Sequence, residues 1–453
     1  MRIFISTGEV SGDLQGALLV ESLYKAAADR QIDLEITGLG GNRMSAAGAN
    51  ILANTAVIGS MGFVEAIPFI LPTLKIQQLT KNYIRANSPD VLVLIDYPAA
   101  NLALASYIKK HLPHIPVVYY IAPQDWAVPM LNNVSKIAKV VDKLLAIFPA
   151  EYEYFKSKGI DAVFVGHPLL DRLSSAPNKQ QARLNLKIDS SEKIITLLPA
   201  SRQQEIKYLL PVMCAAARQI VQQLPDTKFL IPVSLDRYRD AIIAAVKEYD
   251  LPAQILDGKT LDAIAAADLA IAKSGTVNLE IALLNIPQVV IYKIHPLTAW
   301  IGRRIGFKVP LMSPTNLIVN RMIVPELQQE AVTAENITTE VIKLLSNPEI
   351  RQEIIAGYQE MRSLLERRET TPTSHTLAVE DCEPLRPSSV SKTDFASEVT
   401  FEGNAASSAH DLQFSESRTT GEHSSKHRAA SLLGTTKIAD RVATEIFDLV
   451  SAY

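Results

Sequence analysis

The sequence predicts an α/β protein with two doubly wound parallel-sheet units, and three observations carry this prediction. Short apolar runs recur along the chain, most of them are apolar on both faces, and stretches with helical spacing separate them. Strands that are buried on both faces belong to parallel sheets covered by helices. Alternation of such strands with helices indicates βαβ units. The strands are too many for one Rossmann unit, so we expect two in tandem.

The expected elements alternate along the whole chain. Apolar runs that predict strands in the first half lie at residues 3–6, 34–37, 91–95, 117–121, 144–148 and 163–165. Those in the second half lie at residues 194–198, 229–233, 254–256, 269–272 and 288–292. The clearest amphipathic stretches, which predict helices, lie at residues 13–28, 206–224 and 236–249.

Changes of composition predict the domain boundaries. The polar stretch 174–190 separates an expected N-terminal domain, 1–173, from an expected C-terminal domain, 190–366. Residues 369–430 are rich in Ser, Thr, His, Glu and Ala and lack apolar periodicity, which predicts a disordered insertion or long loop. Its histidines show no metal-ligand spacing. Apolar residues then recur at helical spacing within 431–453, and we expect this last helix to pack back on the N-terminal domain.

Composition and charge exclude several classes of protein. The 453 residues are 47% hydrophobic, which is ordinary for a globular protein. The 45 Lys and Arg against 48 Asp and Glu give a net charge of −3, which argues against a general nucleic-acid binder. Two cysteines cannot form a disulfide framework and favour a reducing compartment. No uncharged apolar run reaches the ~18 residues that a transmembrane helix needs.

Candidate site residues follow the strands, because ligands in open parallel sheets bind beyond the carboxyl ends of the strands. The first strand leads into Gly8-Glu9-Val10-Ser11-Gly12-Asp13, a tight turn whose helix N-terminus can offer N–H groups to an anion or polar ligand. The alternative is an ordinary turn capped by Ser11 or Asp13. Gly-x-Gly-x-x-Gly is absent, so there is no dinucleotide fingerprint.

Three other candidates occur in the first half, each with two interpretations. Asp96 directly follows the strand at 91–95 and could act as a general base or cap a loop. Trp126 could line a sugar or acyl pocket or belong to the core. His167 could contact a diphosphate or act as a hinge, or it could be a hydrogen-bonded histidine at the domain junction.

The second half contains two phosphate-type turns. Arg202, next to Ser201, has a fork that suits a phosphate, with an Arg202–Glu205 surface pair as the alternative. The turn at 274–276 is Ser-Gly-Thr, which can donate N–H and hydroxyl bonds to phosphates. Glu280 could accept hydrogen bonds from a ribose diol, or simply favour the helix N-terminus. Together these features indicate a nucleotide-sugar enzyme.

Several motifs occur together as they do in one family. Over about residues 1–366 and 431–453, the chain resembles the lipid-A-disaccharide synthases, which are membrane-associated glycosyltransferases of family 19 with the GT-B fold, two Rossmann-like domains facing a cleft. The matching motifs are Gly8-Glu9-x-Ser11-Gly12-Asp13, Met61-Gly62-x-Val64-Glu65, Ile95-Asp96-x-Pro98, Gly166-His167-Pro168, Leu198-Pro199-x-Ser201-Arg202, Ser274-Gly275-Thr276-x-x-Leu279-Glu280, and Asn316 with Val324-Pro325-Glu326-Leu327.

The resemblance implies an inverting glycosyl transfer without a metal or cofactor. UDP-2,3-diacylglucosamine would donate its sugar to 2,3-diacylglucosamine 1-phosphate (lipid X), giving the β-1′,6-linked disaccharide 1-phosphate and UDP. The acceptor's 6-hydroxyl would lose its proton to Asp96. The residues implied at the substrates and the leaving diphosphate are Ser11, Gly12, Asp13, Ser201, Arg202, Ser274, Gly275 and Thr276, with Glu280 at the ribose and Asn316 matching another residue important in the family.

The acyl chains of both substrates imply a membrane surface as partner. We expect a peripheral protein on the cytoplasmic face of the inner membrane, and we leave a homodimer open. Residues 63–74 and 300–311 combine apolar and basic side chains that suit an anionic lipid interface. The alternative is that both stretches are core-facing helices near the cleft.

Two other functions stay open. One is another GT-B enzyme that uses a UDP-sugar with a different acceptor, and the other is a non-catalytic nucleotide-sugar-binding protein. Loss of an acyl pocket would favour the first. The second is supported by the insertion and by altered loops: Ala99 and Ala200 stand where the family commonly has Asp and Gly, and residues 122–126 also depart from its pattern. The joint presence of Asp96, Arg202, Glu280 and Asn316 argues against the non-catalytic hypothesis.

Overall fold

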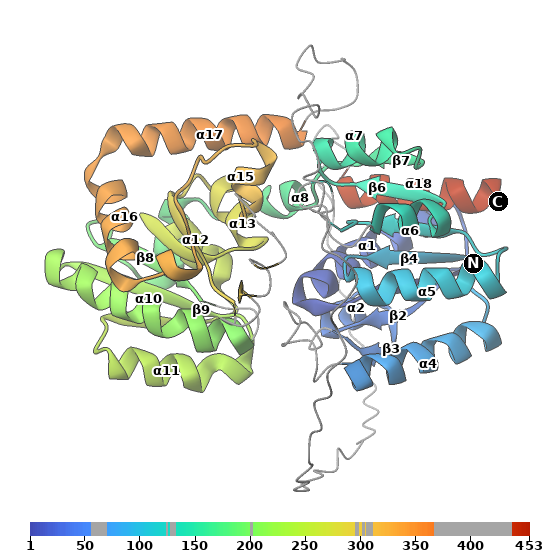
Figure 1. Cartoon of the computed structure of the whole chain (residues 1–453), viewed down its shortest axis with the longest axis horizontal. Helices are drawn as coiled ribbons and strands as arrows, with labels where there is room; N and C mark the ends of the chain where they lie inside the picture. Colours follow the sequence, from blue (N-terminus) through green and yellow to red (C-terminus); the bar gives the residue numbers. More distant parts are fainter. Residues whose placement is uncertain are drawn as a thin grey trace, which may run out of the picture. The chain divides into compact units, whose positions relative to one another are not determined.

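The computed structural model of the chain is shown in Figure 1. It describes residues 1–55, 70–123, 126, 133–199, 203–294, 299–300, 304, 311–366 and 437–453. By its contacts the chain divides into a unit made of 1–369 with 436–453 and a second unit, 370–435. All of the described residues belong to the first unit. The segment 369–430, expected to be a disordered insertion, lies outside them.

Two sheets form the framework of this unit. The strands of the first sheet are β1 (Arg2–Thr7), β2 (Glu35–Gly40), β3 (Asn50–Asn54), β4 (Val91–Ile95), β5 (Val117–Tyr120), β6 (Lys143–Ala146) and β7 (Ala162–Phe164). Those of the second are β8 (Lys193–Leu198), β9 (Thr227–Val233), β10 (Ala253–Asp257), β11 (Leu269–Lys273), β12 (Gln288–Tyr292) and β13 (Glu326–Gln328).

Both sheets have the strand order of a doubly wound fold. The first runs β3-β2-β1-β4-β5-β6-β7 and the second β10-β9-β8-β11-β12-β13. Every described pairing is parallel. In each sheet the order reverses beside the first strand, between β1 and β4 and between β8 and β11. The predicted fold class, two parallel-sheet α/β units, is confirmed.

Helices connect the strands and cover the sheets. Those that follow strands of the first sheet are α1 (Glu9–Asp29), α2 (Asn42–Ala46), α4 (Ile70–Ala86), α5 (Pro98–His111), α6 (Asn133–Val140), α7 (Pro149–Ser157), α8 (Leu169–Leu173) and α9 (Lys179–Leu186). Later in the chain come α10 (Gln203–Gln223), η3 (Asp236–Tyr238), α11 (Arg239–Glu248), α12 (Thr260–Ala266), α13 (Val277–Leu283), α15 (Pro314–Ile318), η4 (Gln329–Ala331), α16 (Ala334–Ser346), α17 (Pro348–Glu366) and α18 (Ile438–Ala452).

The apolar strands of the first sheet are buried on both faces, as parallel strands require. Successive side chains of a strand point to opposite faces. Accordingly Val91 and Val93 of β4 belong to the cluster that includes α1 and α18, whereas Leu92 and Leu94 belong to the cluster that includes α4 and α5. All four side chains are fully buried. This double cover explains why the runs are apolar without alternation.

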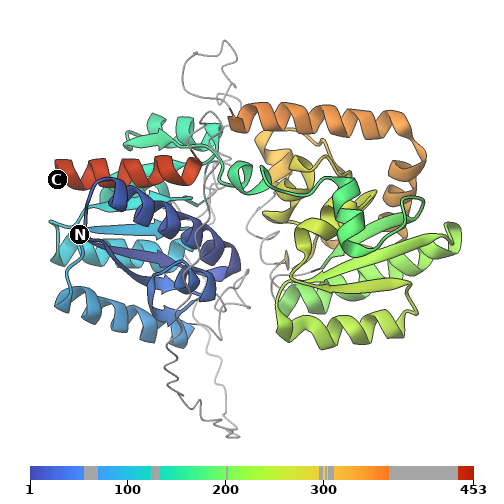
Figure 2. The same cartoon turned by 180° about the vertical axis from the view of Figure 1, so that it is seen from behind.

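The C-terminal helix α18 lies beside α1, as the views in Figures 1 and 2 both show. Val442 and Ile446 are fully buried on its inner face. The backbone N–H of Ile438 donates to the carboxylate of Asp171 at the start of the helix. Two ion pairs tie it to the first sheet's elements: Lys25–Asp440 at 2.7 Å and Lys143–Glu445 at 2.8 Å.

Three local features were not given by the sequence analysis. The first helix begins at Glu9, not at residue 13, so the predicted turn is the helix's first turns. The polar stretch 174–190 contains the helix α9. Its Ala182 and Leu186 belong to a buried cluster of the second sheet, and so few apolar side chains give no clear periodic pattern in the sequence. The edge strands β3 and β13 were not predicted, since both are short and only partly buried.

Candidate active site

The reversal of strand order in the first sheet brings two candidate segments together. Thr7, the last residue of β1, pairs with Ile95, the last residue of β4. Gly8 and Asp96 therefore lie next to each other at the carboxyl edge of the sheet, where open parallel sheets bind their ligands.

Asp96 and its neighbour Tyr97 adopt left-handed backbone conformations. Their φ angles are +49° and +50°. Few residues other than glycine adopt this region, and such conformations cluster at active sites, where the surrounding structure enforces them. The backbone N–H of Asp96 donates to the carbonyl of Ile121 at 3.0 Å. The Tyr119 hydroxyl donates to the Asp96 carbonyl, also at 3.0 Å.

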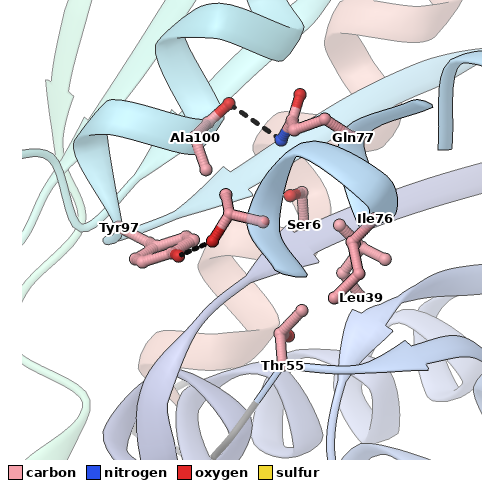
Figure 3. A pocket seen from close by; sticks show the side chains of 8 residues that line it. Ser6, Leu39, Thr55, Ile76, Gln77, Tyr97 and Ala100 are labelled. Carbon is pink, nitrogen blue, oxygen red and sulfur yellow. Dashed lines mark hydrogen bonds between the residues drawn. The ribbon is translucent and has the colours of Figure 1, made fainter. Parts of the chain in front are cut away.

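Tyr97 packs over the start of α1 and borders a small cavity, shown in Figure 3. A Cβ at Gly8 would lie 2.6 Å from Cγ of the Tyr97 ring, so only glycine leaves room for this contact. The Tyr97 hydroxyl meets the hydroxyl of Thr73 at 3.4 Å. The cavity is lined by Ser6, Leu39, Thr55, Thr73, Ile76, Gln77, Tyr97 and Ala100.

The predicted ligand turn at Ser11, Gly12 and Asp13 has mainly structural contacts. Asp13 is buried, and its carboxylate accepts backbone N–H groups of Gly41 at 2.7 Å and of Arg43 and Met44 at 3.1 Å. Asp13 therefore acts as a capping residue, which was one of the two interpretations, but it caps α2 and not its own helix. A Cβ at Gly12 would collide with the Thr7 hydroxyl, so this glycine serves the close approach of α1 to β1. Ser11 is half-buried in the first turn of α1.

The second sheet has an equivalent edge. Leu198 at the end of β8 pairs with Ala272 of β11, which places the segments after both strands side by side. Ser201 and Arg202 lie outside the described residues. Beyond them, Glu205 in the first turn of α10 pairs with Lys273 at the end of β11, at 3.2 Å. Glu205 is thus an ion-pair partner at this edge, and the alternative Arg202–Glu205 pair lies outside the described residues.

The Ser274-Gly275-Thr276 turn is partly committed to internal bonds. The Ser274 hydroxyl donates to the carbonyl of Met312 at 3.0 Å. The Gly275 N–H donates to Oδ1 of Asn278 at 2.8 Å. Thr276 is exposed. Of the three predicted phosphate donors, Thr276 is the one that faces solvent in the structure.

Glu280 is buried one turn into α13 and holds an ion pair with Arg172 of α8. Burial raises the pKa of its carboxyl, while the charges of Arg172 and Arg43 lower it. The carboxylate that was predicted to accept ribose hydroxyls is paired with an arginine in the structure. The sequence contained no sign of this partner, because Arg172 lies 108 residues away in the chain.

Asn316 uses both ends of its amide inside the protein. Its Nδ2 donates to the Val324 carbonyl at 3.1 Å and to the Glu326 carboxylate at 3.0 Å. Its Oδ1 accepts the N–H groups of Ile323 and Val324 at 2.9 and 3.1 Å. An amide has two N–H donors and two lone pairs on oxygen, so all four are in use. Asn316 is fully buried, and these bonds hold the loop at residues 323–324.

His167 is a buried, neutral side chain. Its Nδ1 accepts the N–H of Leu169 at 3.3 Å, and its ring packs on Phe148 with centroids 5.1 Å apart. Burial lowers the pKa of the imidazole to about 3. A neutral imidazole brings no positive charge to a diphosphate. The structure therefore favours the interpretation of His167 as a hydrogen-bonded histidine.

Trp126 also belongs with the core. Its ring centroid lies 5.6 Å from that of Phe148, and its side chain packs against the buried cluster.

Among the described residues, no helix is both long and apolar enough to cross a bilayer. The same residues contain no cluster of three or more His, Cys, Asp or Glu side chains that could hold a metal ion. The predicted motif at 61–65 and most of the stretches 63–74 and 300–311 lie outside the described residues. At the edge of the first stretch, Ile70, Leu71 and Leu74 of α4 are exposed.

Comparison with known proteins gives a consistent result. A family model described as lipid-A-disaccharide synthetase matches residues 3–380. A lipid-A-disaccharide synthase from Gloeothece citriformis is 53% identical over 367 residues, covering 81% of this chain and 96% of that protein. Another, from Synechocystis sp., is 54% identical over 369 residues, covering 81% and 94%. The structure of UDP-GlcNAc 2-epimerase from Neisseria meningitidis matches with a TM-score of 0.54 at 12% identity, covering 81% and 100%, which shows the fold alone.

Proposed function

The chain belongs to the lipid-A-disaccharide synthetase family, and from that premise we propose how its residues divide the work of the reaction. It is a glycosyltransferase that transfers the sugar of UDP-2,3-diacylglucosamine to lipid X and releases UDP. The acceptor's 6-hydroxyl attacks the anomeric carbon with inversion. The reaction therefore needs a base at this hydroxyl and positive or N–H-donating groups at the leaving diphosphate.

Asp96 is the base in this proposal. The observation that carries it is its left-handed backbone at the point where the strand order of the first sheet reverses. A carboxylate at the carboxyl end of a central strand lies where substrates bind in such sheets, and hydrogen bonds fix its backbone on both sides. A carboxylate on a fixed backbone has less freedom to lose before it accepts the proton from the attacking hydroxyl.

The nucleotide half of the donor binds at the edge of the second sheet. We assign Arg202 and Ser201 to the diphosphate on the family motif, together with the turn 274–276 on its place after β11. An arginine fork matches two phosphate oxygens. Glu280 accepts the ribose hydroxyls, and UDP binding would then require Arg172 to share or leave this carboxylate.

Two further groups of predicted residues act by position. Asn316 holds residues 323–324 and also donates to the Glu326 carboxylate. That carboxylate accepts hydrogen bonds from the backbone N–H groups of Met312 at 2.6 Å and Ser313 at 3.0 Å. The Met312 carbonyl in turn accepts a hydrogen bond from the Ser274 hydroxyl, so Asn316 supports the nucleotide turn indirectly, through Glu326 and Met312. Ser11, Gly12 and Asp13 shape the wall of the site beside Asp96.

Access to acylated substrates calls for contact with a membrane. In the first turns of α4, Ile70, Leu71 and Leu74 are 51%, 70% and 58% exposed. Apolar side chains beside basic ones suit the surface of an anionic bilayer. Trp300, with Arg304 stacked 5.3 Å from its ring, is exposed in the second expected stretch. We propose peripheral binding to the cytoplasmic face of the inner membrane through these residues.

Membrane binding is tested with phosphatidylglycerol-containing vesicles in a flotation assay. We expect the double variant Leu71→Asp, Leu74→Asp to lose vesicle binding. The matched control Leu184→Asp changes a leucine of α9 that is 66% exposed, and should bind as the wild type does. Equal binding of all three proteins would remove α4 from the proposal. If light scattering shows that the wild type is a dimer and the double variant a monomer, this surface would instead be assigned to a homodimer interface.

The base is tested by turnover of purified protein in detergent with both substrates. We expect Asp96→Asn and Asp96→Ala to lower kcat by about 10²–10⁴-fold. The control is Asp90→Asn at the opposite end of β4, where the carboxylate accepts the Arg2 N–H and the amide oxygen can replace it. Full activity of the Asp96 variants would exclude it as the base. Intact UDP binding without product by the wild type would point to a different acceptor.

A further inference from the structure

The backbone of Asp96 is held by a buried side chain that no motif singled out. Asn101 lies one turn into α5 and is fully buried. Its Nδ2 donates to the Asp96 carbonyl at 2.6 Å, and also to the carbonyls of Ile95 at 3.2 Å and Ser6 at 3.3 Å. Its Oδ1 accepts the Ser6 hydroxyl at 2.7 Å. One amide thus joins the ends of β1 and β4 to the residue that follows β4.

The contacts of Asn101 fall where the chain leaves its ordinary conformation. The Cα–Cβ bond of a residue in the left-handed conformation points in a different direction from that of an extended or helical residue at the same place. Asp96 and Tyr97 are both left-handed, so the direction of the Asp96 side chain depends on whatever holds these two residues. Asn101 and the Tyr119 hydroxyl both donate to the same Asp96 carbonyl, and the Asn101 N–H donates to the Tyr97 carbonyl at 3.1 Å.

We infer that Asn101, with Tyr119 in support, is a positioning residue that aims the Asp96 carboxylate at the acceptor hydroxyl. The inference rests on the proposed role of Asp96 as the base. Asn101 itself does not touch substrate, because its amide is enclosed by the ends of two strands. Its effect on the reaction therefore passes through Asp96.

The first test separates kcat from KM. A misplaced base slows the chemical step by about 10–100-fold and leaves substrate binding unchanged. We expect Asn101→Ala to lower kcat in this range, with KM for both substrates and UDP affinity preserved. Tyr119→Phe removes one donor to the Asp96 carbonyl without opening a large cavity, and should lower kcat less. If Asn101→Ala does not fold, Tyr119→Phe still tests the same contact.

The second test is a double-mutant cycle in single-turnover assays, which resolve very slow reactions. If Asn101 acts through Asp96, Asn101→Ala should have no further effect on kcat in the Asp96→Ala background. A loss that multiplies in both backgrounds would overturn the inference and make Asn101 a structural residue. The control Thr196→Val removes a buried hydroxyl that donates to the Ala263 carbonyl at 2.6 Å, and should lower stability but not kcat.

The failure of the inference and that of the proposed function give different results. Full activity of Asp96→Ala would exclude the base, whatever Asn101 does. Loss of activity in Asp96→Ala, combined with wild-type kcat in Asn101→Ala and Tyr119→Phe, would keep the base and refute the positioning role.

Discussion

At the scale of single residues, polar side chains at the strand ends divide by how far their hydrogen bonds are already used. Asp13 accepts hydrogen bonds from backbone N–H groups, and Asn316 uses its amide on backbone groups and the Glu326 carboxylate, so both support the site. Thr276 is exposed and keeps its hydroxyl available to a ligand. Sequence motifs mark both kinds alike, because a buried capping residue and a ligand-binding residue draw on the same polar side chains.

The contact between Gly8 and Tyr97 makes a prediction about both stability and activity. Gly8→Ala would place Cβ 2.6 Å from the Tyr97 ring and force it away. We expect a loss of stability of about 1–3 kcal/mol and at least about a tenfold loss of turnover, because Tyr97 is joined to Asp96. Urea unfolding and the turnover assay measure these effects.

A control for Gly8→Ala is Gly159→Ala. Gly159 has a φ of +75° and nothing within 4 Å of the added Cβ, so the substitution introduces backbone strain without a collision. It should cost about 1 kcal/mol of stability and leave turnover intact. Equal losses of turnover in both variants would show that Gly8 acts through stability alone.

The buried His167 predicts a dependence of stability on pH. Its folded pKa of about 3 lies below the unfolded value of 6.5, so the unfolded chain takes up a proton first as pH falls. Stability from this residue is complete above pH 6.5 and is lost on acidification toward pH 3. Between pH 7.5 and 5.0 we expect the wild type to lose on the order of 2 kcal/mol more than His167→Gln.

The comparison with the variant is needed because a second buried group acts in the opposite direction. Burial raises the pKa of Glu151 to about 8, so its contribution is complete below pH 4.5 and falls as pH rises through 8. Urea unfolding of both proteins at the two pH values measures the difference. Parallel pH profiles of wild type and variant would show that His167 is not held neutral.

At the scale of elements, helices far apart in sequence complete one face of the first sheet. The α18 helix packs on α1, with an apolar inner face and ion pairs at its rim. Burial of apolar side chains contributes far more to such a contact than exposed charge pairs do. The short α8 has a different role, because it supplies Arg172 to Glu280 and Asp171 to the start of α18.

The two kinds of contact in α18 can be compared by substitution. Ile446→Ala removes a fully buried side chain and should cost about 2–5 kcal/mol of unfolding free energy. Asp440→Asn breaks the pair with Lys25, whose side chain is 63% exposed, and should cost less than about 1 kcal/mol. Urea unfolding measures both. A larger loss in Asp440→Asn would mean that charge, not burial, holds this helix.

At the scale of the whole molecule, the two sheets repeat one topology and place their candidate residues equivalently. In each, the segments after the first and fourth strands meet where the strand order reverses. The catalytic carboxylate proposed here belongs to the first reversal, and the nucleotide turn to the second. The contacts that define both sites come from the described residues of one unit.

The segment outside that unit gives a prediction about the whole chain. A relative with the same activity in its name aligns over 367 residues that make up 96% of it, so it has little room for an additional segment of this length. Replacing residues 371–434 by a flexible Gly/Ser linker should therefore leave turnover within about twofold, since the length of an insertion has little effect on the free energy of unfolding. Loss of turnover with unchanged unfolding would instead assign the segment a part in catalysis.

The fold class, with its two parallel sheets, and the family were predictable from the amino-acid sequence alone. Parallel strands covered on both faces need unbroken apolar runs, and such runs are visible locally, as are Asp96 and the Ser-Gly-Thr turn that follow them. The contacts of each polar residue came from the three-dimensional fold instead. Asn101 and Arg172 carry no motif. Asp13 matches a motif whose ambiguity is resolved by backbone groups 28, 30 and 31 residues away. Side-chain hydrogen bonds depend on which segments the fold brings together, and local sequence does not specify this.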